Sequence, residues 1–252
     1  MTKKEREKYL QKRLFEMQEF ERELHLQGIK YIGGVDEAGR GPLAGPVVAA
    51  CVVLPQDFDV LGVDDSKKLT EKKREILYDK IVEKAVAYGV GMEDADVIDS
   101  INILQATKSA MRKAVVKANN MLAEKNPGAV RFVRADKSDV AAGEEISIEH
   151  LLIDAIKLEN FNVSQTAIVK GDSKSLSIAA ASIIAKVYRD RIMVNYAAKY
   201  PGYLFEKNKG YGTEAHYEGI EENGITPIHR RSFLKKFRDH HGTIMGKSDD
   251  KI

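Results

Sequence analysis

The stretch Gly33–Ala50, GGVDEAGRGPLAGPVVAA, places two adjacent acids between a strand-like run and a loop of glycine, arginine and proline. The run KYIGGVD, which ends on the first acid, and the run PVVAACVVL after the loop are short and contain β-branched side chains, which favours two strands. Since only the glycine loop joins them, we expect the two strands to be neighbours in one sheet. Asp36 and Glu37 then lie near the end of the first strand.

The rest of the chain alternates between helical and strand-like patterns. Apolar periodicity and stop signals predict helices over 4–27, 70–87, 100–125 and 173–199, and further strands over 87–92, 130–136, 150–154 and 165–171. Beyond Pro201 we expect two short helices and no strong strand, the first helix opening at Thr213 and closing at Asn223 and Gly224. Strands first follow one another and later alternate with helices, so the pattern predicts an α/β protein with a mixed sheet flanked by helices.

Composition limits the class of protein. The 252 residues, 43% of them hydrophobic, are enough for one main domain, and the 40 basic and 38 acidic residues nearly cancel to a net charge of +2. The single cysteine, Cys51, lies in an apolar run, which excludes an internal disulfide and favours a core residue in a reducing compartment. Without a leader-like segment or a membrane-length apolar run, the sequence predicts a soluble cytoplasmic protein with no membrane partner.

Four acids each follow a strand-like run: Asp36, Glu37, Asp154 and Asp172. If those strands are parallel neighbours, their carboxylates crowd together at one edge of the sheet, where like charges repel unless cations neutralise them. Carboxylate oxygens without zinc-type histidine spacing indicate a hard divalent ion, Mg²⁺ or Mn²⁺, and two such ions suit phosphodiester hydrolysis.

Other interpretations of these acids stay open. Asp172 directly precedes a predicted helix and is equally a helix N-cap, while Asp154 is equally a turn residue. Neighbours on a regular strand point to opposite faces, so Asp36 and Glu37 can face one metal centre only if the strand breaks there, which the glycines make feasible.

The loop AGRGPLAG carries a weak dinucleotide-binding pattern, because Gly39, Gly41 and Ala44 have the spacing G-x-G-x-x-A. That motif needs a helix to begin in the loop, whereas prolines interrupt it and a strand follows. The better interpretation is that bare glycine backbone lets a polymer approach closely, with amide N–H groups facing hydroxyl or phosphate oxygens.

Basic residues cluster over 66–74, 206–213 and 229–238. Each run alone is usually a solvated surface, but three runs in a nearly neutral chain favour a footprint for a phosphate backbone. Tyr211 lies between two glycines in the second run, where its ring is either free to stack on a sugar or base or buried.

Taken together, the motifs resemble the ribonuclease HII family, the type 2 ribonucleases H. The resemblance covers residues 32–237 and includes GVDEAGRGPLAGPVVAA, DDSKKLTEKKRE, LLIDAIKL, IVKGDSKSLSIAAASIIAKVYRDR, YPGYLFEKNKGYGTEAH and GITPIHRRSF, in the family's order. It implies a ribonuclease H-like fold and endonucleolytic cleavage of RNA in RNA–DNA hybrids. It also implies incision at single ribonucleotides embedded in duplex DNA, leaving 3′-hydroxyl and 5′-phosphate ends.

Site residues follow from the same resemblance. Asp36, Glu37, Asp154 and Asp172 would be the catalytic acids that bind Mg²⁺ or Mn²⁺. The loop Gly39, Arg40 and Gly41 would sense the 2′-hydroxyl, Tyr211 would pack on the sugar, and Ser66 and Lys67 would contact the nucleic-acid backbone. We expect a helical extension over 1–29, a catalytic domain over 30–200, a substrate-binding helical region over 201–252, and a monomer.

Two segments depart from the family pattern. The connection over 129–150 is longer than in the family and could alter the sheet edge or partly cover the site. The N-terminal helix lies outside the shared motifs, where it either contacts nucleic acid or simply docks on the core. Three other functions remain open: a nucleic-acid binder that does not cut, a DNA nuclease or strand-transfer enzyme on the same fold, and, more distantly, a dinucleotide enzyme.

Overall fold

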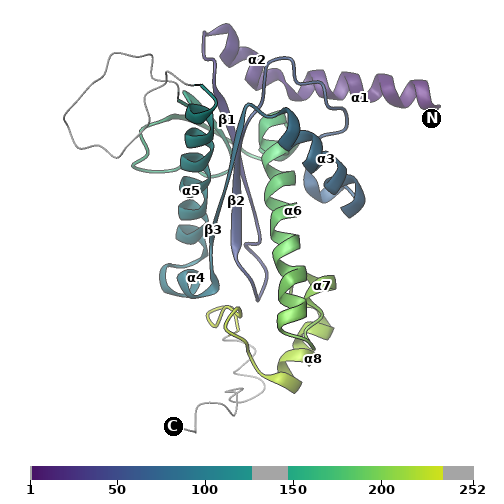
Figure 1. The fold of residues 1–252 in the computed structure, drawn as a ribbon, viewed down its shortest axis with the longest axis vertical. Helices are drawn as coiled ribbons and strands as arrows, with labels where there is room; N and C mark the ends of the chain where they lie inside the picture. Colours follow the sequence, from purple (N-terminus) through teal and green to yellow (C-terminus); the bar gives the residue numbers. More distant parts are fainter. Residues whose placement is uncertain (1, 127–146, 235–252) are drawn as a thin grey trace.

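The computed structural model describes residues 2–126 and 147–234. Its centre is a five-stranded sheet in the order β3-β2-β1-β4-β5 (Figure 1). The strands are β1 (Ile32–Ala38), β2 (Val47–Val53), β3 (Ala87–Glu93), β4 (His150–Asp154) and β5 (Ser164–Ile168). β1 pairs antiparallel with β2, and β2 with β3, whereas β1 pairs parallel with β4, and β4 with β5. The predicted mixed sheet of an α/β protein is confirmed.

Helices cover both faces of this sheet. α5 (Ile103–Glu124) lies against one face and α6 (Leu176–Lys199) against the other, so the sheet is the middle of three layers (Figure 1). β2 is buried along its whole length, and Cys51 lies within it as a fully buried residue, as the apolar run predicts. Two apolar clusters, one on each face, hold the layers together.

Glycine permits the close approach of α6 to the central strand. A Cβ atom on Gly34 of β1 would lie 2.1 Å from the carbonyl carbon of Ser177, in the first turn of α6. Any side chain at position 34 would therefore push the helix off the sheet. Gly34 lies two residues before Asp36, and its lack of a side chain lets the start of α6 lie directly over β1 at that point.

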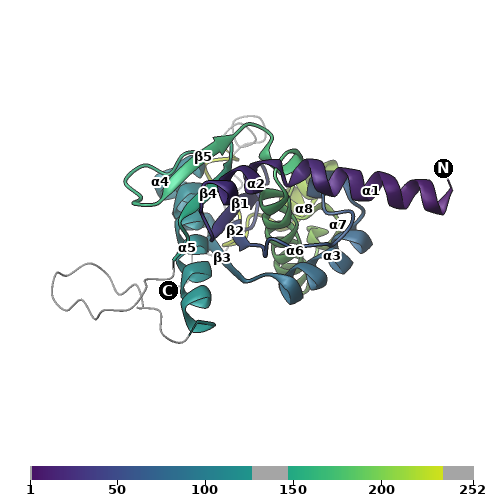
Figure 2. The ribbon, with the colours of Figure 1, turned by 90° about the horizontal axis from the view of Figure 1, so that it is seen from above.

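The N-terminal segment forms two helices where periodicity predicts one over 4–27. α1 (Lys3–Met17) and α2 (Glu19–Leu26) meet at Gln18, and Met17 is fully buried at the joint. α1 extends away from the body of the molecule, while α2 lies near the end of the sheet (Figure 2). The chain bends because Met17 packs into the core, whereas most of α1 stays exposed.

The remaining elements are shorter. They are η1 (Ser66–Lys68), α3 (Glu71–Lys84), α4 (Ala95–Ile101), η2 (Gly171–Ser173), α7 (Phe205–Asn208) and α8 (Glu214–Asn223). The predicted helix over 100–125 is divided at Asn102, whose φ of 67° ends α4 and whose side chain caps α5. The helix predicted over 70–87 ends at Lys84, because Ala87 already begins β3.

α8 lies where the pattern predicts the first of two helices after Pro201, but α7 precedes it. The strand predicted over 130–136, and most of the long connection over 129–150, lie outside the described residues. None of the helices in the described part of the chain has the length and apolar character that crossing a membrane requires.

Candidate active site

The face of the sheet on which each acid lies follows from strand alternation. Val35 of β1 and Ile153 of β4 are paired neighbours and belong to the core on the α5 face. Asp36 and Asp154, one residue further along, therefore lie side by side on the opposite face, beneath α6. Glu37 lies on the α5 face, because β1 continues in regular register as far as Ala38. The strand therefore does not break at the two acids, which was the condition for both side chains to face one metal centre.

Asp36 is held as a buried carboxyl group, 4% exposed. Its Oδ1 accepts a hydrogen bond of 2.7 Å from the Glu37 amide. Burial first, and then the charges of Glu37 and Asp154, raise the pKa of Asp36 well above its ordinary value, and the nearby Ser182 hydroxyl of α6 opposes this only slightly. The ionised form of Asp36 is therefore unfavourable here, and a bound cation would offset the repulsion between the carboxylates.

Glu37 is also in an unfavourable environment for an ionised carboxyl group. Its Oε1 lies 3.4 Å from Nη1 of Arg40, whereas its Oε2 is buried and has no hydrogen-bond partner among the described residues. Burial raises the pKa of Glu37, Arg40 opposes that effect, and the charge of Asp154 adds to it. A buried carboxylate oxygen without a donor is costly, so it is a ready ligand for a cation.

Asp154 and Asp172 are joined through the backbone. Oδ1 of Asp154 accepts a hydrogen bond of 2.7 Å from the amide of Gly171, which ties the end of β4 to η2. Asp172 is 5% exposed, and its Oδ2 lies 3.3 Å from Nζ of Lys67, an otherwise exposed lysine. Burial is the largest cause that raises the pKa of Asp172, followed by the charge of Asp65.

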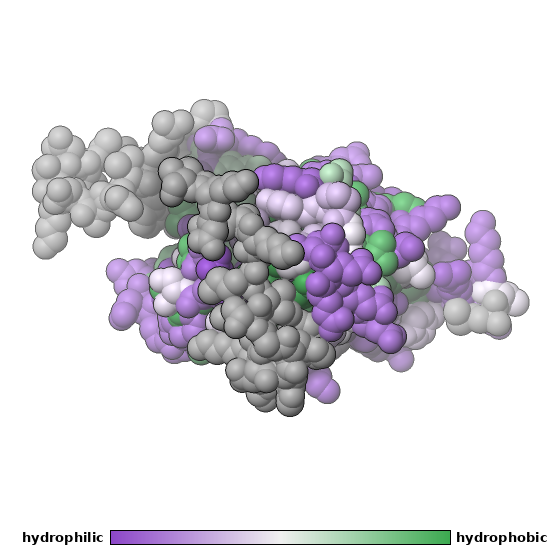
Figure 3. Space-filling model, turned by 90° about the horizontal axis from the view of Figure 1, so that it is seen from below, coloured by the Kyte–Doolittle hydropathy of each residue, from purple (hydrophilic) through white to green (hydrophobic). Residues whose placement is uncertain are grey.

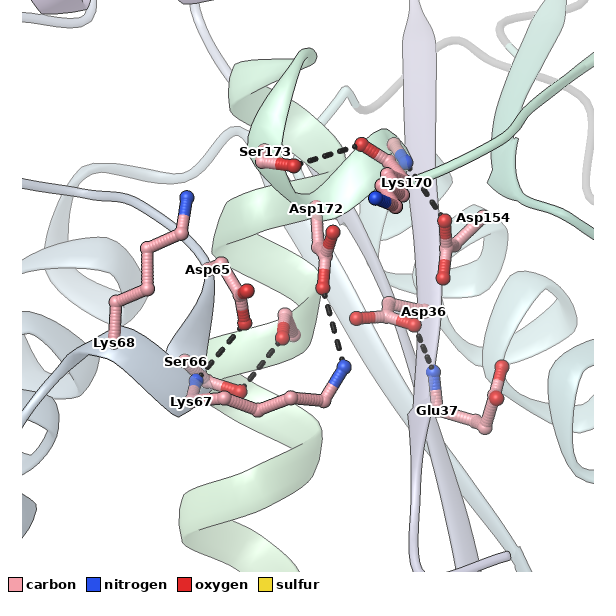
Figure 4. Close-up of polar contacts among 12 residues, drawn as sticks. Asp36, Glu37, Asp65, Ser66, Lys67, Lys68, Asp154, Lys170, Asp172 and Ser173 are labelled. Carbon is pink, nitrogen blue, oxygen red and sulfur yellow. Dashed lines mark hydrogen bonds and ion pairs between the residues drawn. The ribbon is translucent and has the colours of Figure 1, made fainter.

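Helix capping does not explain Asp172. The N-cap of α6 is Ser175, whose hydroxyl accepts a hydrogen bond from the amide of Ile178. The capping interpretation of Asp172 is therefore wrong for this helix. Figure 4 shows its carboxyl group facing that of Asp36, with Asp154 beside them and Glu37 at the edge of the group.

The donor set fits a hard divalent cation. All four groups are carboxyl groups, three have raised pKa values, and one has an orphaned oxygen. Within residues 2–126 and 147–234, however, no three histidine, cysteine or acidic side chains converge as a complete metal-binding cluster. The structure therefore brings the acids to one edge of the sheet and leaves their role as metal ligands a prediction.

Most of the predicted site residues line one cleft of about 190 Å³. Its walls are Asp36, Glu37, Ala38, Gly39, Arg40, Gly41, Ser66, Lys67, Asp154, Ser182, Lys186, Arg189 and Tyr211. Asp172 is absent from this lining. Tyr211 is 45% exposed, so the alternative of a buried ring is wrong, and its Cε1 would lie 3.7 Å from a Cβ atom on Gly41. An exposed aromatic ring thus adjoins the glycine loop.

Ser66 occupies a less accessible place than Lys67. Ser66 is 4% exposed, and its hydroxyl lies 2.8 Å from that of Ser182, which lies near Asp36. The hydroxyl therefore supports the acids from inside. Lys67, by contrast, has 78% of its side chain exposed.

Three residues of α6 that line the cleft escaped prediction from the sequence: Ser182, Lys186 and Arg189. Nζ of Lys186 lies 2.7 Å from Oδ1 of Asp190, and burial lowers the pKa of this lysine. The signal was present as spacing, because positions 182, 186 and 189 share one face of a helix otherwise rich in alanine.

A buried histidine pair supports the backbone of Tyr211. The Thr226 amide donates to Nδ1 of His229, so the proton of His229 is on Nε2, which faces Nε2 of His216 at 3.1 Å. His216 then donates from Nδ1 to the carbonyl oxygen of Tyr211, 2.9 Å away. Both rings are neutral in this relay, consistent with pKa values that burial lowers, to about 3 for His229.

The N-terminal helices reach the segment that carries Asp172. Nη2 of Arg13 in α1 donates a hydrogen bond of 2.8 Å to the carbonyl oxygen of Ser173. In α2, Oε1 of the buried Glu21 accepts hydrogen bonds from both Ser175 and Ser177 at the start of α6. The two helices are therefore docked on the segment between η2 and α6, next to one of the acids.

Among solved structures, the fold is similar to that of ribonuclease H2 from Pyrococcus horikoshii, at 26% identity and a TM-score of 0.58. That alignment covers 83% of this chain and 98% of the other. The ribonuclease HII of Archaeoglobus fulgidus, solved in a complex with PCNA, aligns at 25% identity and a TM-score of 0.58, over 79% of this chain and 93% of the other. Both likenesses support a ribonuclease H-like fold.

Sequence comparisons agree with this fold. The ribonuclease HII of Leuconostoc mesenteroides is 53% identical over 215 residues, which are 85% of this chain and 74% of the relative. The ribonuclease HII of Bacillus mycoides is 50% identical over 233 residues, 92% and 78% of the two chains. The model of the family Ribonuclease HII matches residues 33–236, which contain all four acids and the cleft. The chain therefore belongs to the ribonuclease HII family and is a ribonuclease H.

Proposed function

We propose that this ribonuclease H also incises duplex DNA at a single embedded ribonucleotide, in addition to cutting the RNA strand of RNA–DNA hybrids. The observation that supports this most is the shared cleft, in which acids, a glycine loop and an exposed tyrosine lie together. Such a site needs only one ribonucleotide for recognition, because a single 2′-hydroxyl distinguishes that nucleotide from its DNA neighbours.

The acids would hold the divalent ions on which the family depends. Asp36, Glu37, Asp154 and Asp172 are the proposed ligands, and Mg²⁺ or Mn²⁺ suits their oxygen donors. Bound there, such ions supply a nucleophilic water and neutralise charge on the phosphodiester, which yields 3′-hydroxyl and 5′-phosphate ends.

Residues of the chain itself would orient the strand. Lys67 places a cation at the mouth of the cleft, where it can pair with a backbone phosphate. The ring of Tyr211 offers a flat surface for the sugar, and the backbone of Gly39, Arg40 and Gly41 offers amides for its 2′-hydroxyl. Ser66 would contribute through the backbone of its turn, since its hydroxyl is bonded internally.

Basic side chains in the cleft lining, Arg40, Lys67 and Lys186, suit a polyanion. Seen from the lower end of the molecule, many of the described residues on the visible face are hydrophilic, with some apolar ones among them (Figure 3). We propose that the region over 201–252 contributes to this substrate-binding surface, with catalysis in the region over 30–200 and the segment over 1–29 as an extension. We also expect a monomer, as in the resemblance described above, and a cytoplasmic location, where the single buried thiol would stay reduced.

Cleavage of matched duplexes tests the proposal. The substrates are a DNA duplex with one ribonucleotide, the same duplex without it, and an RNA–DNA hybrid, each with Mg²⁺, with Mn²⁺ and with chelator. We expect cutting of the first and third only, dependent on metal, with 3′-hydroxyl and 5′-phosphate ends. Equal cutting of the two DNA duplexes would instead identify a DNA nuclease, and binding without any cutting would identify a non-catalytic binder.

A further inference from the structure

The loop that joins β1 to β2 is held from behind by a buried arginine of the C-terminal region. Arg230 is 0% exposed, and every hydrogen bond that its guanidinium makes with described residues goes to a main-chain oxygen. The distances are 2.6 Å to Gly39, 2.9 Å to Arg40, and 2.8 and 3.0 Å to Gly45. One rigid cation thus gathers three carbonyl groups of the loop.

A second buried arginine completes the support. Arg189 of α6, 1% exposed, donates to the carbonyl oxygens of Ala44, Pro46 and Lys209 at 2.9 to 3.1 Å. Burying a cation costs free energy unless polar groups surround it, and here carbonyl dipoles take that role. The two guanidinium groups therefore fix the conformation of the loop at its base and at its tip.

The direction of the loop amides follows from the planarity of the peptide bond. In a trans peptide the C=O and the next N–H point in opposite directions. Because the carbonyls of Gly39 and Arg40 turn inward to Arg230, the N–H groups of Arg40 and Gly41 turn outward. Both residues line the cleft, and neither N–H has a hydrogen-bond partner among the described residues.

We propose that Arg230 is a positioning residue for recognition of the substrate's 2′-hydroxyl. Its guanidinium holds two successive peptide groups so that the N–H groups of Arg40 and Gly41 present paired donors to a hydroxyl oxygen in the cleft, beside Tyr211. Recognition by backbone donors is independent of the base, which suits an enzyme that acts at any ribonucleotide. This role rests on the proposed function at embedded ribonucleotides.

Arginine is the side chain that this geometry requires. Its planar fork can bond carbonyls in three places at once, whereas the single ammonium of lysine keeps the charge but cannot span them. Gly39 contributes a φ of +93°, and a Cβ atom there would lie 2.1 Å from Nε of Arg189. The loop therefore depends on an unusual backbone shape that buried cations secure.

The test measures discrimination between two duplexes rather than activity alone. Binding of Arg230→Lys to a DNA duplex with one ribonucleotide, and to the same duplex without it, is followed by fluorescence anisotropy in chelator, where cleavage is absent. We expect the preference for the ribonucleotide duplex to fall about tenfold, as for the loss of two hydrogen bonds. Affinity for the DNA duplex should stay unchanged, because phosphate contacts dominate it.

A matched control is Arg112→Lys on α5, away from the cleft, which removes an arginine hydrogen bond to the main-chain carbonyl of Glu159. It should keep full discrimination. If Arg230→Lys fails to fold, Gly41→Pro removes one of the two donors at the surface and should lower discrimination by several-fold.

The outcomes separate two failures. If the parent chain does not prefer or cut the ribonucleotide duplex, the proposed function is wrong. If the parent discriminates and Arg230→Lys, or Gly41→Pro in its place, discriminates equally well, the role of Arg230 is overturned. Equal weakening on both duplexes would show that Arg230 serves only the general shape of the surface, which also overturns it.

Discussion

Replacing Asp36 with asparagine should abolish cleavage and, in the presence of chelator, stabilise the fold. The aspartate is buried, and burial together with the charges of Glu37 and Asp154 raises its pKa well above the ordinary value of 3.8. Between those two pKa values the folded state binds more protons than the unfolded state, so stability falls as pH rises through that window. Asparagine does not titrate, so it avoids this loss and still accepts the 2.7 Å hydrogen bond from Glu37.

The size of the effect follows from linkage. For each pKa unit by which folding raises the pKa of a carboxyl group, the free energy of unfolding with that group ionised falls by about 1.4 kcal/mol. For a chain of this size, that corresponds to about 3 to 6 °C in Tm. We therefore expect Asp36→Asn to melt above the parent at pH 7.5 in chelator, by about that interval for each unit by which folding raises the pKa of Asp36. Cleavage should fall by about 10³-fold or more, because ligand loss removes several kcal/mol of transition-state stabilisation.

Thermal melting with chelator and with Mg²⁺, beside cleavage of an RNA–DNA hybrid, measures both effects. Mg²⁺ should raise the Tm of the parent and leave Asp36→Asn nearly unchanged. Asp59→Asn is the control, since Asp59 is exposed and paired with Lys84, and it should keep both cleavage and the metal response. A variant that melts below the parent in chelator, or that responds to Mg²⁺ as the parent does, would refute the reasoning.

Three further predictions concern stability and are measured by urea unfolding. Gly34→Ala places a Cβ atom 2.1 Å from the Ser177 carbonyl carbon, so we expect a loss of about 3 kcal/mol or more, and an unchanged midpoint would contradict the close packing. Burial lowers the pKa of His229 to about 3, so stability should fall below about pH 6.5 by up to about 1.4 kcal/mol per pH unit, and His229→Gln should lessen that dependence. Glu21→Ala leaves buried donors at the start of α6 unpaired and should cost about 1–3 kcal/mol, whereas exposed Glu23→Ala should cost little.

The sequence predicted the central strands and helices because short runs of neighbouring residues determine them. β1, β2 and α6 follow from β-branched runs and an alanine-rich helical pattern, and the structure has them close to the expected bounds. Periodicity did not predict the breaks at Gln18 and Asn102. The first depends on the packing of Met17 into the core, and the second on a positive φ at Asn102. Apolar periodicity indicates that a helix is present but does not show where the helix is interrupted.

The sequence predicted those parts of the candidate site whose residue types are themselves distinctive. The acids and the glycine loop stand out in the sequence, and the structure gathers most of them in one cleft. Arg189 and Arg230 did not stand out, because arginine is usually exposed and nothing local indicates that carbonyl groups will surround it. The strand break that the glycines made feasible is absent, since Gly34 serves close packing against α6 and β1 keeps its register through Asp36 and Glu37.

The order of strands in the sheet also bears on how the protein forms during synthesis. β1, β2 and β3 follow one another in the chain and pair as antiparallel neighbours, so they can associate as soon as they leave the ribosome. β4, η2 and α6 emerge later, and only their arrival brings Asp154 and Asp172 beside Asp36. Asp154 and Asp172 can therefore meet Asp36 only after β4, β5 and η2 have left the ribosome, by which time the antiparallel strands that they join can already have paired.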